Sequence, residues 1–339
     1  MPKILVTGGA GYIGSHTVLA LNNAGYKVIV YDNLSTGSRE AVLPPARLET
    51  GDLRDEEKLN RIMRREKFDA VIHFAASIVV PESVSDPLKY YLNNTSNTMV
   101  LVNLAQKNRI PNFVFSSTAA VYGMPEQIPV NETAPLAPIN PYGRSKVMSE
   151  WVIQDTQQAH ENFEYVILRY FNVAGADPQG KIGQRTPNAT HLIKVACQAA
   201  LGIKDCLPVY GTDYPTPDGT GIRDYIHVAD LADVHVKALE YLQQGHKPEI
   251  FNCGYGHGYS VREIIQAVKK VSGVDFKVCE KGRRAGDPAS LVADPGLLNS
   301  KINWHPCHDQ LETIVENAFI LLNGYPDPKI TAFLTSIDC

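Results

Sequence analysis

The sequence predicts an α/β fold in which a doubly wound parallel sheet is followed by a smaller C-terminal α/β domain. Short apolar runs alternate with helical patterns through the first half of the chain, which is typical of parallel strands joined by crossover helices. The runs are apolar throughout, which indicates strands that helices cover on both faces. The expected strands are residues 4–6, 28–31, 71–74, 113–115 and 166–168.

The character of the sequence changes after Phe171. Two segments rich in Gly, Pro and Thr, residues 172–190 and 211–222, flank a helix-like stretch over residues 191–202. Long irregular segments in compact proteins are usually functional loops. We therefore predict a first domain over residues 1–171 and a smaller second domain over residues 172–339, with residues 224–242 packing back on the first. The stretch after Pro328 shows no cap or period, and we assign it no structure.

The composition excludes several classes of partner. The formal net charge of −4 leaves no positive field that would attract nucleic acid or an anionic membrane. No apolar run approaches membrane-spanning length, and the first expected strand follows Met1 without a charged leader. We therefore expect a soluble cytoplasmic protein without nucleic-acid or membrane partners.

Six cysteines are scattered along the chain without CxxC pairs and at too low a density for a disulfide scaffold. This pattern predicts reduced, mostly buried thiols. The cysteines are Cys197, Cys206, Cys253, Cys279, Cys307 and Cys339.

A glycine-rich turn follows the first expected strand and opens a helix. Gly8, Gly11 and Gly14 have the spacing G-x-x-G-x-x-G. Glycine at these places permits a tight turn and lets the amides of the helix start, around Tyr12 and Ile13, approach a pyrophosphate. A glycine triplet alone is weak evidence, since such a turn is often only a turn.

Asp32 completes the pattern, because it ends the second expected strand about 20 residues after the last glycine. A carboxylate there accepts hydrogen bonds from the adenosine ribose and repels a 2′-phosphate. The context predicts a Rossmann domain that binds NAD in preference to NADP; the alternative is a strand-end aspartate with no ligand.

A further turn, residues 51–53, follows another strand-like segment. Asp52 and Leu53 are placed there to contact the adenine with a carboxylate and an amide. Asp52 fits equally well as the N-cap of the helix that follows, so the sequence leaves both interpretations open.

Tyr142 and Lys146 lie one turn apart on one face of a predicted helix. A phenol has a reference pKa of about 10, so Tyr142 needs a nearby ammonium and a positive nicotinamide to act as a base at neutral pH. Upstream, Thr118 ends an expected strand, and its hydroxyl is the candidate to share the proton. A Tyr-x-x-x-Lys pair is common by chance, but this one follows the glycine turn and the strand-end hydroxyl in the order that such a site requires.

These motifs resemble those of the extended short-chain dehydrogenase/reductase superfamily and, within it, the UDP-glucose 4-epimerase family. The resemblance covers nearly the whole chain, and the last three segments below are closest to the epimerase pattern. The segments are residues 7–14 (TGGAGYIG), 31–34 (YDNL), 73–76 (HFAA), 81–84 (PESV), 142–146 (YGRSK), 168–172 (LRYFN), 219–228 (GTGIRDYIHV) and 283–287 (RRAGD).

The resemblance implies a set of NAD contacts and assigns Tyr142 as the base with Thr118 as the assisting hydroxyl. Ile78 departs from the best-known bacterial form, which has a lysine near the cofactor phosphates, and this departure bears on NAD affinity. The implied NAD contacts are Gly8, Gly11, Tyr12, Ile13, Gly14, Asp32, Asn33, Asp52, Leu53, Phe74, Ala75, Asn93, Tyr142, Lys146 and Tyr170.

The resemblance also implies a UDP-sugar substrate. Arg223 and Arg284 match positions that hold the diphosphate, with a solvated or ion-paired arginine, for example beside Asp224, as the alternative. His191 replaces a second asparagine of the best-known bacterial form; it donates to phosphate or simply begins a helix. The other implied contacts are Thr118 and Tyr142 at the sugar, Asn172 near the sugar and diphosphate, Tyr210 at the uracil, Asp287 at the uridine ribose and Leu291 beside the sugar.

The reaction implied is the interconversion of UDP-glucose and UDP-galactose by transient oxidation at sugar C4, rotation of the 4-keto intermediate and re-reduction on the opposite face. A homodimer is usual in the family. The alternatives are another nucleotide-sugar epimerase, a 4,6-dehydratase or a non-catalytic NAD-binding sensor. Ala119 and Ala120 stand where dehydratases carry an Asp-Glu pair, and the Tyr/Lys pair that sensors typically lose is present.

Leu291 matches the position where family members differ in side-chain size next to the sugar. Leucine there predicts a preference for UDP-glucose and UDP-galactose over N-acetylated sugars; the alternative is a core leucine that touches no substrate.

Two histidines, His227 and His235, have no metal-ligand partner at useful spacing. We interpret both as structural, expect Asp230 to cap the helix between them, and predict no metal site.

Overall fold

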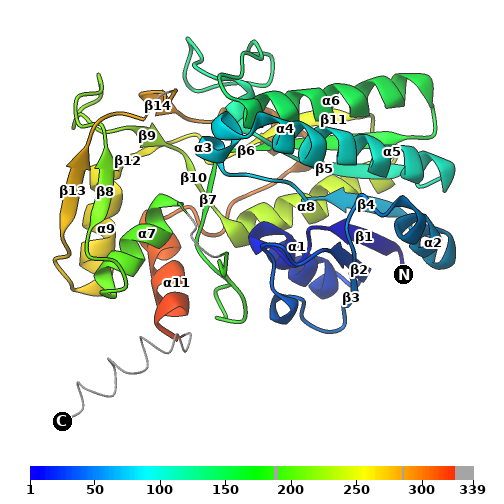
Figure 1. Cartoon of the computed structure of the whole chain (residues 1–339), viewed down its shortest axis with the longest axis horizontal. Helices are drawn as coiled ribbons and strands as arrows, with labels where there is room; N and C mark the ends of the chain where they lie inside the picture. Colours follow the sequence, from blue (N-terminus) through cyan, green and yellow to red (C-terminus); the bar gives the residue numbers. More distant parts are fainter. Residues whose placement is uncertain (187–189, 285, 325–339) are drawn as a thin grey trace.

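A seven-stranded parallel sheet forms the centre of the computed structural model, which describes residues 1–186, 190–284 and 286–324 (Figure 1). The strand order is β11-β6-β5-β4-β1-β2-β3, and every pair is parallel. The order changes direction between β1 and β4, which is where open α/β sheets bind ligands. The strands are β1 (Lys3–Thr7), β2 (Lys27–Asp32), β3 (Arg47–Thr50), β4 (Ala70–His73), β5 (Asn112–Thr118), β6 (Glu164–Tyr170) and β11 (Glu249–Cys253).

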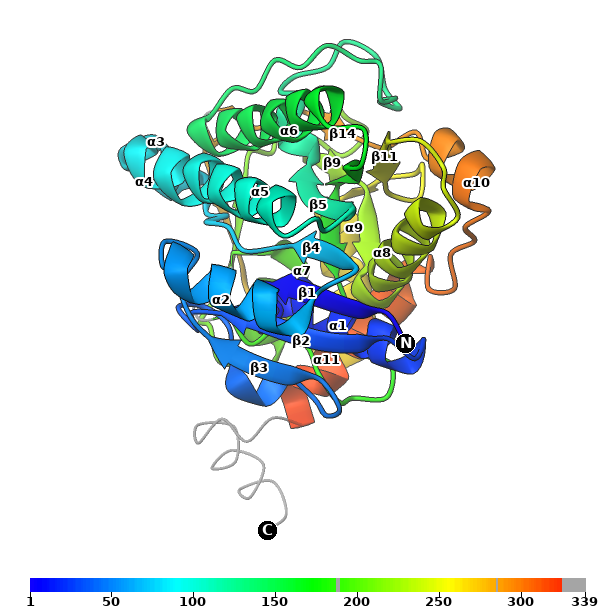
Figure 2. The same cartoon turned by 90° about the vertical axis from the view of Figure 1, so that its right-hand side faces the viewer.

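Helices cover both faces of this sheet (Figure 2). Alternate strand residues point to opposite faces, so Ile4 and Val6 pack with α1 and α8, whereas Leu5 packs with α2, α5 and α6. Each face thus has its own apolar core. The helices are α1 (Tyr12–Asn23), α2 (Glu56–Glu66), α5 (Asn97–Lys107), α6 (Pro141–Ala159) and α8 (Val228–Gln243).

Short helical turns connect β4 to α5. They are α3 (Val80–Ser85), α4 (Pro87–Tyr90) and a π-helical turn, Tyr91–Ser96, that runs directly into α5. Two 3₁₀ turns, Arg39–Ala41 and Ala119–Val121, follow β2 and β5. No helix in the described ranges combines the length and apolar character needed to cross a membrane.

The second half builds a separate small core beside the main sheet (Figure 1). Three helices, α7 (Leu192–Ala200), α9 (Val261–Ser272) and α11 (Leu311–Gly324), pack around the parallel strand pair β8–β13. The remaining elements are β7 (Asn172–Ala174), β8 (Leu207–Tyr210), β9 (Ile222–Arg223), β10 (Tyr225–His227), β12 (Tyr259–Ser260), β13 (Val278–Lys281), β14 (Ser290–Leu291) and α10 (Gly296–Ile302).

The predicted fold class is confirmed, and all five expected strands lie in the central sheet. Two central strands are not among these five. β3 is the strand-like segment expected before residue 51; it lies at the edge and is partly exposed, so its residues Arg-Leu-Glu-Thr lack a continuous apolar run. β11 comes from the second half of the sequence and pairs with β6. The central sheet therefore contains residues from both sides of the domain boundary predicted at residue 171. Helix α8, within the segment 224–242, lies against α1 and the sheet.

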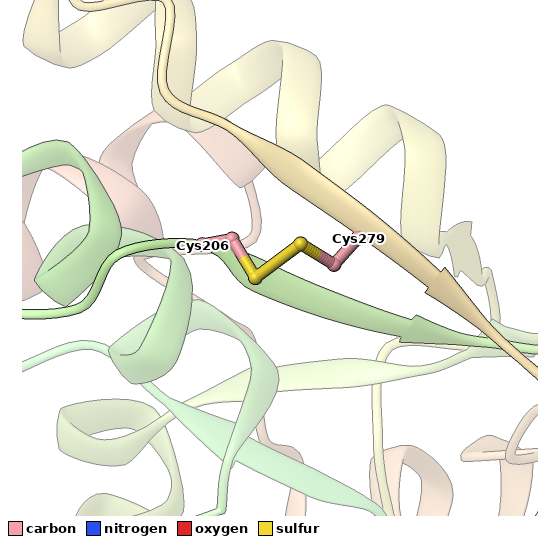
Figure 3. The surroundings of a disulfide bond; sticks show 2 residues. All are labelled: Cys206 and Cys279. Atoms are coloured by element: carbon pink, nitrogen blue, oxygen red, sulfur yellow. A yellow bond between two sulfur atoms is a disulfide. The ribbon is translucent and has the colours of Figure 1, made fainter.

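The prediction of six reduced thiols is wrong for two of them. Cys206 and Cys279 form a disulfide with their Cα atoms 6.1 Å apart (Figure 3). The two cysteines are 73 residues apart in sequence, and the pairing of β8 with β13 is what brings them together. Cys197 and Cys253 are buried free thiols and Cys307 is exposed. Cys339 and the stretch after Pro328 lie outside the described residues.

Two helix caps also differ from expectation. The N-cap of α8 is His227, whose Nδ1 accepts from the Ala229 amide at 3.1 Å. Asp230 lies in the first turn and instead accepts the His308 amide at 2.9 Å and the Tyr255 hydroxyl at 2.6 Å. The helix after Asp52 is capped by Asp55. Several short polar residues compete at each helix start, and tertiary contacts decide which one caps.

A buried ion pair fastens α6 to β6. Arg169 and Glu150 are 3% and 0% exposed, and they join through Nη2–Oε2 at 2.6 Å and Nε–Oε1 at 3.1 Å. Ser117 on β5 donates to the same carboxylate, and Arg169 donates to the Tyr122 hydroxyl at 2.9 Å. The pair therefore fixes α6 over the ends of β5 and β6.

Replacing Arg169 with Met leaves the Glu150 carboxylate buried without its cation, and we expect the free energy of unfolding to fall by about 3–5 kcal/mol. The double variant Glu150→Leu/Arg169→Met removes both charges and should recover most of that loss. Urea unfolding followed by circular dichroism measures both effects. A single variant as stable as the wild type would show that the pair holds nothing together.

Candidate functional site

The carboxyl ends of the central strands bring the sequence-predicted residues to one edge of the sheet. Thr7 of β1 stands opposite His73 of β4, and Thr118 of β5 stands opposite Tyr170 of β6. Because all these strands run in the same direction, the loops that follow them gather at this edge.

The glycine turn after β1 has no room for side chains. Gly8 has φ 73°, and a Cβ there would lie 2.5 Å from the Ala75 amide nitrogen; a Cβ on Gly14 would collide with the Gly8 carbonyl. Gly11 is the N-cap of α1, and no side chain caps the helix. The first-turn amides, including those of Tyr12 and Ile13, are thus presented at a positive helix end that suits a pyrophosphate.

Asp32 lies beside this turn and is held rigidly. Its carboxylate accepts the Ala10 amide at 3.0 Å and the Leu34 amide at 2.8 Å. Burial raises the pKa of this carboxyl, while the two amide hydrogen bonds oppose the shift. The chain therefore fits a dinucleotide here, with an oriented carboxylate where the sequence predicts the ribose contact.

Asn33 and Asp52 meet next to Asp32. The Asn33 amide donates to Asp52 at 2.9 Å, and Arg54 also pairs with this carboxylate, which holds the pKa of Asp52 well below its usual range. Leu53 is buried in the core under this turn.

The loop after β4 faces α8. The ring of Phe74 lies 4.7 Å from the ring of His235, whose Nε2 is 2.7 Å from the Tyr170 hydroxyl. His235 thus holds two predicted cofactor residues, which refines its interpretation as structural. Asn93 donates to the Ser77 hydroxyl at 3.0 Å, which links the π-helical turn to the loop that carries Ala75. Ile78 in the same loop is 49% exposed.

Tyr142 lies in the first turn of α6, close enough to Thr118 for the threonine hydroxyl to act on the pKa of the phenol. Asn140 caps the helix by accepting the Gly143 amide at 2.9 Å, which fixes the first turn and with it Tyr142. One turn later, Lys146 is 4% exposed; its Nζ donates to the Ser116 carbonyl at 2.7 Å and lies 4.7 Å from the Phe115 ring centroid.

Burial governs the titration of both groups. It raises the pKa of Tyr142, while the hydrogen bond with Thr118 acts to lower it. It lowers the pKa of Lys146 to about 7, against an opposing effect of Glu150. Since the Lys146 ammonium is directed at the Ser116 carbonyl, its assistance to the phenolate stays a prediction.

The residues predicted to bind the diphosphate contact the residues predicted to bind the uridine. Arg223 pairs with Asp287, and Arg284 lies 3.8 Å above the ring of Tyr210. Asp224 does not pair with Arg223, because its carboxylate accepts the amides of Tyr255, Gly256 and Ala293. Arg223 is therefore ion-paired, as the alternative interpretation proposed, but its partner is Asp287 and not Asp224.

Strand pairing places Leu291 and Asn172 near these groups. Leu291 on β14 stands opposite Arg223 on β9, and the Asn172 amide donates to the Asp224 carbonyl at 2.9 Å. Leu291 is 9% exposed and packs with Phe171 and Ala119. Ala119 is the residue that follows Thr118 in the sequence.

His191 is the N-cap of α7, but its ring caps no amide of that helix. The ring lies against Gln184, with Nδ1 2.7 Å from the side-chain nitrogen. Burial first, and then Lys194, lower the pKa of His191.

Several supporting residues gave no signal in the sequence. Asn94, 1% exposed, accepts the Ser77 amide at 2.8 Å and donates to the Ser145 hydroxyl at 3.0 Å, which joins the loop after β4 to α6. The sequence predicts its neighbour Asn93 as a cofactor contact. The two residues are both asparagines, so only the burial of Asn94 in the structure reveals its supporting role. The described residues contain no group of three or more His, Cys, Asp and Glu that could hold a metal ion.

Comparison with known proteins gives consistent matches. Residues 4–254 match the model of the NAD-dependent epimerase/dehydratase family. The UDP-glucose 4-epimerase of Azospirillum brasilense is 54% identical over 94% of this chain and 91% of its own. The crystal structure of UDP-glucose 4-epimerase from Brucella ovis in complex with NAD is 46% identical, with a TM-score of 0.92 over 94% of this chain and 98% of that chain. The UDP-Glc/GlcNAc 4-epimerase of Campylobacter jejuni is 50% identical, with a TM-score of 0.84 over 95% and 99%.

The lowered pKa of Lys146 makes a prediction about stability. Its folded-state pKa of about 7 lies below the ordinary lysine value of 10.5, so the unfolded chain binds more protons between these pH values, and stability rises with pH across that window. In Lys146→Met this contribution disappears. The difference in unfolding free energy between wild type and variant should change by about 1.4 kcal/mol per pH unit between pH 7.5 and 9.

Urea unfolding at a series of pH values measures this difference. The matched control is Lys107→Met, because Lys107 is exposed at the end of α5. Parallel pH profiles for the wild type and Lys146→Met would contradict a depressed Lys146 pKa.

Proposed function

The chain belongs to the NAD-dependent epimerase/dehydratase family, and we propose that it is an epimerase that interconverts UDP-glucose and UDP-galactose with NAD as its cofactor. The observation that carries the proposal is the placement of Tyr142 on α6 beside Thr118 at the end of β5, with Lys146 one turn away. These side chains can transfer a proton, and they lie beside the predicted dinucleotide site.

The glycine turn, Asp32 and the loop after β4 would hold the cofactor. The α1 amides face the pyrophosphate and Asp32 receives the adenosine ribose hydroxyls, while Phe74 and Tyr170 are steadied by His235. The oriented Asp32 carboxylate disfavours a 2′-phosphate, so NADP is the poorer ligand.

The protein residues manage the proton. Tyr142 takes the proton of the sugar 4-hydroxyl, and the neighbouring Thr118 hydroxyl is placed to share that proton. NAD, when bound, supplies the acceptor for the hydride from carbon 4 and returns it later. Its positive nicotinamide also opposes the burial that raises the pKa of Tyr142.

Inversion requires that the 4-keto sugar turns over while the nucleotide stays fixed. Arg223 and Arg284 are suited to hold the diphosphate, and Tyr210 with Asp287 the uridine. Arg223 pairs with Asp287, and Arg284 lies over the ring of Tyr210, so the predicted diphosphate and uridine residues lie next to each other. The nucleotide anchor therefore lies in the second half and the chemistry in the first.

The sequence disfavours the neighbouring reactions. A 4,6-dehydratase must eliminate water and needs an acid and a base beyond Thr118, where this chain has Ala119 and Ala120. A non-catalytic NAD-binding sensor has no need for the Tyr142–Thr118 pair. The same assay, conversion of UDP-galactose to UDP-glucose with no 4-keto-6-deoxy product, separates the three.

We also infer a cytoplasmic homodimer. Large apolar side chains lie exposed on neighbouring elements of one region, and α5 lies beside α6 in it. A second copy of this chain would bury them, which favours association. The side chains are Leu88 on α4, Leu92 in the π-helical turn, Met99 on α5, and Met148 and Trp151 on α6. The free thiols Cys197, Cys253 and Cys307 suit a reducing compartment and support the cytoplasmic inference, whereas the Cys206–Cys279 disulfide is of a kind that is rare there.

Tyr142→Phe removes only the phenolic hydroxyl, so folding and bound NAD should remain while turnover falls by about 10²–10⁴-fold, the usual contribution of a proton-transfer group. Epimerase rates and the NAD released on denaturation measure the two properties. Tyr90→Phe, whose ring lies against Tyr142 at 6.4 Å, is the matched control. Near-normal turnover in Tyr142→Phe would exclude the phenol as the base.

Leu291→Cys shortens a wall beside the sugar, so kcat/KM for UDP-N-acetylgalactosamine should rise relative to UDP-galactose, on the order of tenfold. We expect the wild type to prefer the plain hexoses. The alternative core role predicts lower stability and no change in this ratio. Equal use of both sugars by the wild type would also remove Leu291 from a gatekeeping role.

Trp151→Glu places a charge in the proposed dimer interface, and light scattering should show a shift from dimer to monomer. Ile320→Glu on α11 is the control, because Ile320 is also an exposed apolar side chain, 56% against 54% for Trp151. A monomeric wild type at micromolar concentration refutes the dimer.

A further inference from the structure

A lysine in the first turn of α7 is buried without a carboxylate partner. Lys194 is 8% exposed, and its Nζ donates to the backbone carbonyls of Gln184 at 2.7 Å and Thr186 at 3.0 Å. Burial lowers the pKa of Lys194 to about 8, and no acidic group in the described part of the chain offsets that effect. A buried lysine is rarely retained unpaired, so its position calls for a role.

The two carbonyls belong to a loop that is anchored at several points. At its start, the Tyr12 hydroxyl donates to the Gly175 carbonyl at 2.7 Å. Further along, Gly183 lies against Leu321 of α11 so closely that no Cβ would fit. Lys194 fixes the next stretch through Gln184 and Thr186. The Gln184 backbone therefore has a defined position relative to α7.

The Gln184 side chain extends from this backbone to the ring of His191. With the Gln184 amide oriented as it is in the structure, its nitrogen donates to His191 Nδ1 at 2.7 Å. A neutral imidazole that accepts at Nδ1 carries its proton on Nε2. The Nε2–H group is then a donor, and no amide of α7 or cap interaction uses the ring.

Lys194 also keeps the imidazole neutral. Its charge adds to burial in lowering the pKa of His191. Both side chains, together with Gln184, line one side of a cavity of about 20 Å³ that is otherwise mostly apolar. The cavity is too small for a phosphate, so it marks where the three polar side chains meet, and the donor on His191 is the feature suited to an anion.

We propose that Lys194 is a positioning residue for substrate binding: by clamping the Gln184 and Thr186 carbonyls it holds the Gln184 amide on His191 Nδ1, so that His191 presents Nε2–H to a diphosphate oxygen. This inference rests on the proposed function, in which a UDP-sugar is the ligand. It deepens that function because the histidine acts as a neutral hydrogen-bond donor, a role that an asparagine amide performs equally well. Lys194 itself need not touch the substrate.

A double-mutant cycle on the full-length holoenzyme tests the coupling. Lys194→Met keeps the apolar stem and removes the donors, and His191→Ala removes the proposed phosphate donor. Each single change should raise KM for UDP-galactose about tenfold, the value of one charge-assisted hydrogen bond, with kcat changed by less than about twofold. The double variant should have a KM no higher than the worse single variant, because Lys194 acts through His191.

Two further variants separate positioning from folding. Lys194→Gln keeps an amide donor for the loop carbonyls without the charge, and it should recover part of the loss in KM. Lys204→Met, an exposed lysine of the segment between α7 and β8, should leave KM unchanged. The proposal is overturned if the increases in KM of the two single variants multiply in the double variant, or if Lys194→Met has the KM of the wild type.

Histidine tautomers give a readout that does not depend on turnover. In ¹⁵N-histidine spectra of the holoenzyme, the His191 signals, identified by their loss in His191→Asn, should show a protonated Nε2 and a bare Nδ1. In Lys194→Met the His191 signals should move toward a mixture of tautomers. A wild-type His191 protonated at Nδ1 refutes the clamp. An inactive wild type with the Nε2–H tautomer would refute the proposed function instead.

Discussion

The buried pair of Arg169 and Glu150 ties together the parts of the molecule on which the candidate site depends. Arg169 stands on β6, and Glu150 on α6 also receives the Ser117 hydroxyl of β5. These are the two strands that end in Thr118 and Tyr170, and α6 is the helix that presents Tyr142 and Lys146. Because an unpaired charge in this core would be costly, the helix has one allowed position over the strands.

A second constraint follows from the parallel sheet. Continuous apolar strands need helices on both faces, and α8 from the second half supplies part of one face against α1. β11 extends the sheet beyond β6 in the same way. The sheet that carries the predicted cofactor residues is therefore completed by chain that follows Asn172 and Arg223, which are predicted to bind the substrate. This interleaving places the two kinds of residue beside each other without a flexible linker between them.

The side chains that are predicted to bind the substrate also contact other side chains of the protein. Arg223 has Asp287, Arg284 has the ring of Tyr210, and His191 has Gln184. These contacts keep long side chains ordered, so less conformational entropy is lost when a ligand binds. The disulfide between Cys206 and Cys279 acts on the same region, since it joins β8, which ends at Tyr210, to β13, which leads to Arg284 (Figure 3).

The sequence by itself determined the fold class, five of the seven central strands, the glycine turn with Asp32, and the helix that carries Tyr142 and Lys146. Each of these depends on local spacing and on the periodic burial of apolar residues, which the order of residues records directly. Only the tertiary structure decided that β11 joins the sheet, that Cys206 meets Cys279, that Asp287 is the partner of Arg223, and that Lys194 and Gln184 surround His191. Those contacts join residues far apart in the chain or depend on which of several similar polar groups is buried. No local pattern encodes them, because their partners are selected by packing.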